Sequence, residues 1–113
     1  VYESLEAAKI LDGLGISSKV VNMHTLKPCD YDAIDQAIAS SKAIISVEEH
    51  SVVGGLGSAI AEYKTQFSKS PAQLILGLPD KFGKTAEYRF LLEKYRLVGE
   101  KIAIDIQNFL KNL

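Results

Sequence analysis

The sequence has little of several features that would point to particular classes of protein. It contains one cysteine, Cys29, in 113 residues, so no disulfide can form within the chain and no cysteine cluster can hold a metal. A lone thiol fits a reducing, cytoplasmic environment. No apolar run approaches the length of a membrane span. The first residues form an amphipathic, acid-containing pattern, which is not that of a signal peptide.

An excess of charge of one sign is also absent. Lys and Arg together number 13 and Asp and Glu 14, giving a net charge of −1. This balance argues against a broad basic surface for nucleic acid and against an acidic tail. The hydrophobic share, 47%, is ordinary for a globular protein. We therefore expect one domain over residues 1–113, with neither nucleic-acid nor membrane partners.

Helical and strand patterns alternate along the chain. Helical spacing of apolar residues predicts helices, and short β-branched runs between turn signals predict strands. The predicted helices cover about 5–14, 31–40, 56–67, a short segment around 91–95, and 99–113, and the predicted strands cover 19–26, 42–49 and 70–79. This order predicts a three-layer α/β/α fold with a mainly parallel sheet.

Three strands make a thin sheet for this fold class. The chain opens directly into a helical pattern, without Met and without a leading strand. We therefore expect a fragment of a longer polypeptide. In the intact protein a further strand should precede residue 1 and lie between the strands predicted at 19–26 and 42–49.

The stretch "SVEEHSVVGGLGSAIAE", residues 46–62, carries the most conspicuous motif. Gly54, Gly55 and Gly57 fall between a predicted strand and a predicted helix, where anions bind in many α/β proteins. However, G-G-x-G is not the dinucleotide pattern, and no P-loop lysine follows. The other interpretation is structural: the glycines let the chain turn sharply and let the helix approach the sheet.

Four polar residues, Glu48, Glu49, His50 and Ser51, precede these glycines. An acid beside a histidine and a serine suggests acid–base or nucleophilic chemistry. Strand alternation, however, places Glu49 and Ser51 on one face and His50 on the other, and no G-x-S-x-G elbow is present. Glu48 and His50, with only the distant His24, do not complete a metal site. We assign no catalytic, cofactor-binding or metal-binding residue here and expect a polar strand end beside a partner surface.

Three ordered motifs resemble the C-terminal domain of transketolases. They are "VEEHSVVGGLGSAIAE" at residues 47–62, V-x-x-x-x-L-K-P-x-D at residues 21–30, and D-x-F-G followed by L-L-x-x-Y at residues 80–95. Similar forms occur in 1-deoxyxylulose-5-phosphate synthase and in pyruvate dehydrogenase-type β subunits. The sequence departs from the family at Arg96, where glycine is usual, and at Val98, where threonine often caps the last helix.

The resemblance implies a non-catalytic domain of a larger enzyme. In such enzymes, thiamine diphosphate and a divalent metal, Mg or Ca, bind between a pyrimidine-binding and a diphosphate-binding domain. The cofactor carries a two-carbon ketol unit from a ketose phosphate to an aldose phosphate. None of those catalytic residues maps onto this chain, so the resemblance implies that the fragment alone binds no cofactor and is inactive.

The family role of this domain is packing and dimerisation, with Glu48, Glu49, His50, Gly54, Gly55 and Gly57 as motif residues at an interface or anion site. The alternatives are the C-terminal domain of a 2-oxo-acid dehydrogenase β subunit and a free-standing anion-binding α/β module.

Overall fold

The structure, a computed structural model, describes residues 2–23, 31–51, 55–78 and 88–113, with the backbone alone at 49–51, 78, 88 and 89. Five helices and two strands occur in these ranges: α1 (Tyr2–Gly13), α2 (Tyr31–Ser40), β1 (Ala43–Ser51), α3 (Leu56–Lys64), β2 (Ala72–Leu78), α4 (Tyr88–Lys94) and α5 (Gly99–Lys111). No described helix is long and apolar enough to cross a bilayer.

The two strands are parallel neighbours joined through α3. Their register runs from Ala43 opposite Ala72 to Glu48 opposite Gly77. The register then shifts, because the next pair is Ser51 opposite Leu78. Two residues of β1, Glu49 and His50, therefore lie in a bulge at the carboxyl end of the strand.

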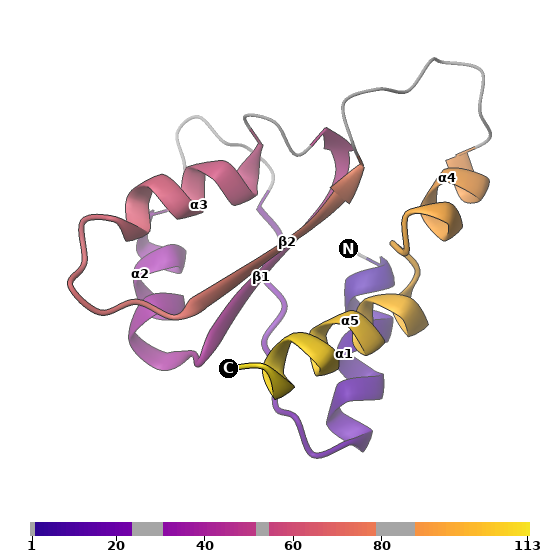
Figure 1. The fold of residues 1–113 in the computed structure, drawn as a ribbon, viewed down its shortest axis with the longest axis horizontal. Coiled ribbons are helices and arrows are strands. Elements are labelled where there is room, and N and C mark those ends of the chain that lie inside the picture. Colours follow the sequence, from indigo (N-terminus) through magenta and orange to yellow (C-terminus); the bar gives the residue numbers. More distant parts are fainter. Residues whose placement is uncertain (1, 24–30, 52–54, 79–87) are drawn as a thin grey trace.

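Helices cover both faces of this small sheet, which confirms the α/β class. Ile45 and Val47 of β1 contact the cluster formed by α1 and α5, whereas Ile44 of β1 packs with Ile34 of α2 and Ile60 of α3. This division follows from the two-residue period of a strand. Figure 1 shows the same arrangement, with α2 and α3 towards one side of the strands and α1, α4 and α5 towards the other.

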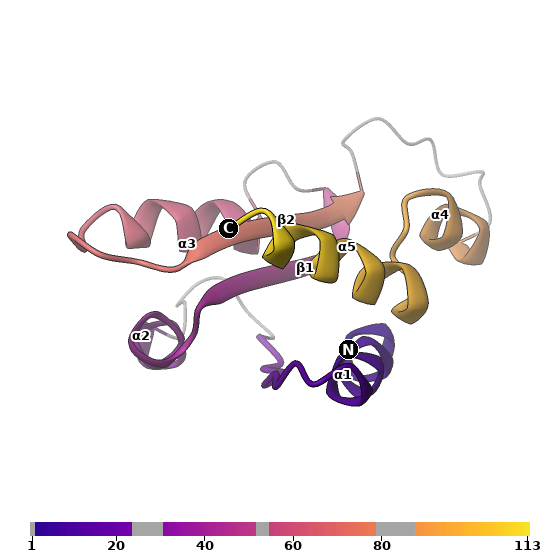
Figure 2. The same cartoon turned by 60° about the horizontal axis from the view of Figure 1, so that its bottom comes forward.

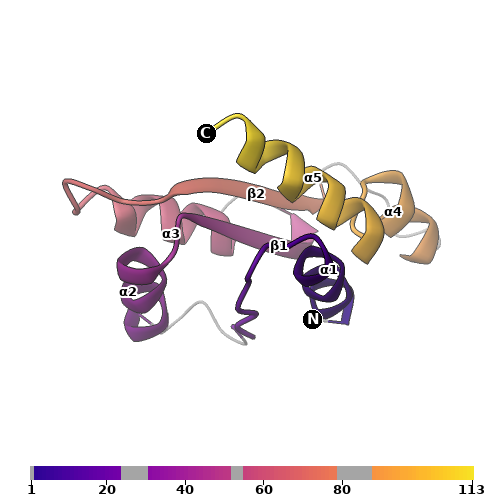
Figure 3. The ribbon, with the colours of Figure 1, turned by 90° about the horizontal axis from the view of Figure 1, so that it is seen from below.

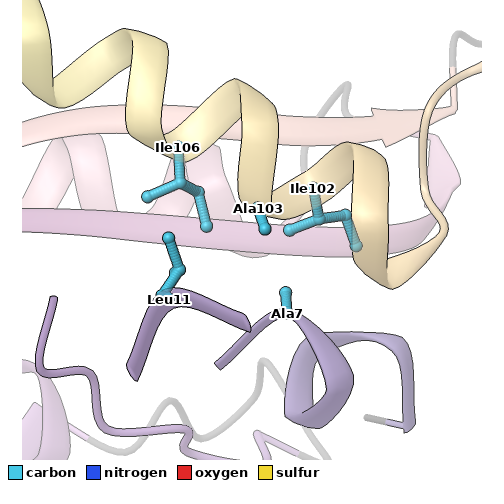
Figure 4. Close-up of a cluster of buried hydrophobic side chains, with 5 residues drawn as sticks. All are labelled: Ala7, Leu11, Ile102, Ala103 and Ile106. Carbon is cyan, nitrogen blue, oxygen red and sulfur yellow. The ribbon is translucent and has the colours of Figure 1, made fainter. Parts of the chain in front are cut away.

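The larger core joins α1 to α5, although these helices lie at opposite ends of the sequence. Its buried side chains are Ala7, Leu11, Ile102, Ala103 and Ile106 (Figure 4). The helices approach closely at Gly99, where an added Cβ would lie 2.7 Å from Cβ of Glu6. The backbone N–H of Gly99 also donates to the Glu3 carboxylate at 2.8 Å. The N-terminus of α5 is thus capped by a side chain from α1.

Aromatic side chains extend the second hydrophobic cluster, which is formed by Ile34, Ile44 and Ile60 between α2, α3 and the sheet. The Tyr31 and Tyr63 rings lie 4.7 Å apart between centroids, and Phe67 meets Tyr63 edge-on at 5.4 Å. The Tyr63 hydroxyl donates to Asp35 at 2.6 Å. This hydrogen bond to a carboxylate raises the pKa of Tyr63, because ionisation would remove the donor and place two negative charges together.

The strand predicted at residues 19–26 is wrong for the part that the structure describes. Residues 16–23 have no strand assignment, and the described sheet contains β1 and β2 only. Figures 2 and 3 show residues 16–23 on the side of β1 away from β2. An extended segment becomes a strand only when another strand pairs with it, and in the described part of the chain neither β1 nor β2 forms a ladder with residues 16–23. The further strand expected between this segment and β1 stays a prediction.

The remaining predicted elements are confirmed, with shifts of a few residues at their ends. The helix predicted at 56–67 ends earlier, at Lys64, and α1 ends at Gly13, two residues before Gly15 adopts a positive φ of 80°. Residues 24–30 and 79–87, which contain most of the V-x-x-x-x-L-K-P-x-D motif and the whole D-x-F-G motif, lie outside the described residues.

Helix α4 ends in a left-handed turn without glycine. Arg96 has a φ of 63°, and the N–H of Leu97 donates to the carbonyl of Leu92 at 2.7 Å, the pattern of a Schellman ending. A side chain in this conformation is strained, because its Cβ crowds the backbone. The Arg96 Nε lies 3.0 Å from both carboxylate oxygens of Asp105, an exposed contact that offsets little of this strain.

Replacing Arg96 by glycine and by alanine separates these two effects. Both variants lose the ion pair with Asp105, but only glycine removes the Cβ. We expect Arg96→Gly to exceed Arg96→Ala by about 1 kcal/mol in the free energy of unfolding, measured by urea denaturation. Equal stability of the two variants would show that the left-handed turn carries no strain.

Candidate functional site

The carboxylate of Glu48 binds the first amides of α3. Glu48 is the last regularly paired residue of β1 before the bulge. One carboxylate oxygen accepts from the backbone N–H of Leu56 at 2.5 Å, and the other from that of Gly57 at 3.1 Å. The N-cap residue of this helix is Gly55, which has no side chain to accept these donors. Glu48 therefore caps α3 from the neighbouring strand.

The Glu48 carboxylate occupies the start of α3, which is the position where the anion-site interpretation of the glycine motif would place a phosphate. A negative group at a helix N-terminus is stabilised by the amides and by the helix dipole. Because the Leu56 and Gly57 amides already bind Glu48, a phosphate could reach them only by displacing that carboxylate. The geometry argues against the anion-cradle interpretation and supports the structural one.

Gly57 lies where α3 touches the sheet. A Cβ at this position would lie 2.7 Å from the Ser46 Oγ and 2.8 Å from two side-chain carbons of Ile75. The Gln73 amide reaches up from β2 and donates to the Gly57 carbonyl at 2.8 Å. Both backbone polar groups of Gly57 are thus bonded to the sheet side chains below it. The glycine is required by this close approach.

The hydroxyl of Ser46 is buried beneath the contact between Gly57 of α3 and the sheet. Ser46 is 2% exposed, and its Oγ has no hydrogen-bond partner among the residues that the structure describes. A buried hydroxyl without a partner is unfavourable. The small size of the side chain, however, provides the room that α3 occupies at Gly57. Ser46 is therefore explained by the space available and not by hydrogen bonding.

The structure brings together only part of the predicted motif. Glu48, Gly55 and Gly57 meet at the start of α3, as described above. Glu49 and His50 lie in the bulge, so the simple alternation used to place them on opposite faces does not apply. Gly54 lies outside the described residues. Among the residues that the structure describes, no group of three or more His, Cys, Asp or Glu side chains is placed to hold a metal ion.

Two residues with structural importance gave no signal in the sequence. Glu3 caps a helix that begins 96 residues later, and Gln73 reaches α3 from the next strand. Neither contact follows a local spacing rule such as the capping box. The apolar N-cap of α5, Val98, was the one available hint, since it leaves that helix without a local acceptor.

The geometry defines an α/β domain whose glycine-rich motif joins a strand tightly to a helix. The family model described as "Transketolase, C-terminal domain" matches residues 1–102. The chain belongs to the transketolase C-terminal domain family.

Similar proteins include separate transketolase sections and larger synthases. The chain is 39% identical over 111 residues to a "Putative transketolase C-terminal section" of Methanocaldococcus jannaschii, spanning 98% of this chain and 34% of the relative. It is 39% identical over 113 residues to a 1-deoxy-D-xylulose-5-phosphate synthase of Dictyoglomus thermophilum, spanning 100% of this chain and 18% of the relative. The chain thus covers about a third of the first protein and less than a fifth of the second.

A solved structure shares the fold. It is titled "Split gene transketolase, inactive beta4 tetramer" and superposes with a TM-score of 0.82 at 38% identity. The match covers 95% of this chain and 35% of that one.

Removing the Glu48 carboxylate should destabilise the protein. In Glu48→Ala the Leu56 and Gly57 amides lose their acceptors, and we expect a loss of about 1–3 kcal/mol in the free energy of unfolding. Glu48→Gln keeps one acceptor oxygen, so its stability should lie between that of the unmodified protein and that of Glu48→Ala. Glu62→Ala removes an exposed carboxylate on the same helix and should change stability by less than about 0.5 kcal/mol. Equal effects of Glu48→Ala and Glu62→Ala would contradict the cap.

Adding one methyl group at Gly57 should also destabilise the protein. Gly57→Ala forces the Ile75 and Ser46 side chains or α3 to shift, at a cost of about 1–3 kcal/mol. Gly13→Ala is the matched control, because nothing lies within 4 Å of its added Cβ. Thermal unfolding followed by circular dichroism gives the comparison. A Gly57→Ala protein as stable as Gly13→Ala would mean that α3 does not contact the sheet this closely.

Proposed function

We propose that this chain is the non-catalytic C-terminal domain of a thiamine-diphosphate-dependent transketolase. The whole enzyme would transfer a two-carbon ketol unit from a ketose phosphate to an aldose phosphate. The proposal rests on the family membership and on the 39% identity to a separate transketolase C-terminal section over 98% of the chain. The relative from Clostridium sp. named as a 6-deoxy-6-sulfo-D-fructose transketolase subunit, 38% identical over 102 residues, supports the same class of enzyme.

Two features of the described residues count against a thiamine-diphosphate site in this chain. The α3 amides, the best candidates for a diphosphate, bind Glu48 instead. The described residues also contain no group of three or more His, Cys, Asp or Glu side chains placed to hold the divalent metal. In the proposed enzyme the cofactor would supply the carbanion chemistry, and pyrimidine-binding and diphosphate-binding domains of the same or a separate chain would hold it. This chain would contribute packing and dimer assembly.

Relatives of similar identity support a second candidate function. The 1-deoxy-D-xylulose-5-phosphate synthase of Dictyoglomus thermophilum is also 39% identical and is matched over the whole chain. We favour transketolase, because the solved structure is titled as a split-gene transketolase and the chain spans 35% of it. An assay of the assembled enzyme distinguishes the two: ketol transfer supports transketolase, and formation of 1-deoxy-D-xylulose 5-phosphate supports the synthase.

Calorimetric titration tests the non-catalytic role. Thiamine diphosphate with Mg²⁺, added to the chain alone, should give no binding heat, because Glu48 occupies the first amides of α3 and the described residues hold no group of metal ligands. The same titration of the chain assembled with its pyrimidine-binding and diphosphate-binding domains should show binding and accompany ketol transfer. Tight binding of the cofactor by the chain alone would overturn the proposal.

Inorganic phosphate serves as a further ligand in that titration. The free-standing anion-binding module considered from the sequence requires phosphate to bind at α3 and Glu48→Ala to change the affinity. Absence of phosphate binding to the unmodified chain supports the enzyme-domain role over that module.

A further inference from the structure

Helices α2 and α3 present aromatic rings to solvent. Tyr63 of α3 contacts two of them: its ring centroid lies 4.7 Å from that of Tyr31 and 5.4 Å from that of Phe67. Tyr31 is 51% exposed and Phe67 is 38% exposed. Figure 1 places α2 and α3 at the end of the molecule away from α4. About half of Tyr31, at one end of this group of rings, thus remains open to a partner.

Two exposed carboxylates border these rings. Asp32 and Asp35 are three residues apart on α2, and Asp35 follows Tyr31 by four residues, so these side chains lie on neighbouring positions of one helix face. The Tyr63 hydroxyl donates to Asp35 at 2.6 Å. This hydrogen bond, together with the charges of Asp35 and Asp32, raises the pKa of Tyr63, so both carboxylates act on the same hydroxyl. The exposed side of Tyr31 is therefore negatively charged.

These carboxylates lack a cationic partner in the part of the chain that the structure describes. Neither Asp32 nor Asp35 forms an ion pair there, and only one oxygen of Asp35 accepts a hydrogen bond. The nearest lysine in sequence to Tyr63 is Lys64, whose Nζ lies 3.4 Å from the Oε1 of Gln73. A metal ion does not fit either, since the described residues hold no group of three or more ligands. The complement to such a surface is an organic cation with a flat apolar face.

We propose that the surface formed by Tyr31, Asp32, Asp35 and Tyr63 binds an arginine side chain of a partner protein. A guanidinium is planar, so it can stack on the exposed ring of Tyr31 while its N–H groups donate to the carboxylates beside that ring. A lysine ammonium has neither the flat face nor the fork of donors, so it should bind less tightly. Tyrosine and arginine are also the residue types on which binding energy concentrates in protein interfaces.

Peptide titration of the whole chain, followed by NMR of the tyrosine ring resonances, tests the proposal. The probe is acetylated and amidated Gly-Arg-Gly, and the control peptide has citrulline, which keeps the shape of arginine without its charge. We expect the arginine peptide to shift the rings of Tyr31 and Tyr63 with a dissociation constant on the order of 1–10 mM. The citrulline peptide should bind at least about fivefold more weakly. Tyr95, whose ring lies beside Lys94, should not shift and serves as the internal reference.

Two variants separate the charge from the ring. Asp32→Asn removes a carboxylate without touching the bond between Tyr63 and Asp35, and Tyr31→Leu removes the ring but keeps an apolar side chain. Each should weaken binding of the arginine peptide by about threefold or more. Asp12→Asn removes an exposed carboxylate from α1 and should leave the affinity unchanged. Circular dichroism checks that each variant is folded.

Three results would overturn the proposal. The first is equal affinity for the arginine and citrulline peptides, which would leave no role for the cation. The second is equal affinity of Asp32→Asn and Asp12→Asn for the arginine peptide, which would place its site elsewhere. The third is a shift of the Tyr31 resonances when the chain alone is concentrated, because a second copy would then be the occupant. None of these outcomes depends on thiamine diphosphate or on the proposed enzyme activity.

Discussion

The bond between Glu48 and the start of α3 fixes the geometry of the central strand–helix joint. The carboxylate at the end of β1 holds two amides of α3, and these amides would otherwise lack an acceptor. The helix axis must then pass close over the sheet, and that close approach requires glycine at position 57 and a small side chain at Ser46. Glu48, Gly57 and Ser46 thus all serve the same contact, that between β1 and the start of α3.

The start of α5 is also capped by a carboxylate from another element. Its N-cap, Val98, has no polar side chain, and the Glu3 carboxylate of α1 accepts from Gly99 instead. A local cap would stabilise each helix by itself, whereas these caps act only when the helix is docked on its neighbour. The helix starts therefore depend on tertiary packing, which couples α3 to β1 and α5 to α1. Small residues again permit the contact, since Gly99 has no room for a Cβ beside Glu6.

The sequence predicted the elements whose signals are local. The apolar stripe of α5 and the continuous apolar run of β1 located those elements within a few residues. The glycine motif indicated a tight strand-to-helix joint. The strand at 19–26 was predicted from its β-branched run, but a strand also needs a hydrogen-bonding neighbour, which propensity does not report. The caps by Glu48 and Glu3 were not predicted, because each carboxylate comes from another element and lies outside the spacing of local capping rules.

The edge of β1 shows where this domain differs from a self-contained sheet. Parallel sheets are generally buried on both faces, and here α1 and α5 cover one face while α2 and α3 cover the other. Both faces thus carry helices, but in the described part of the chain β1 has a hydrogen-bonded neighbour on one side only. An unpaired strand edge is a place where additional polypeptide readily adds. Pairing at this edge of β1 would satisfy backbone groups without disturbing either covered face.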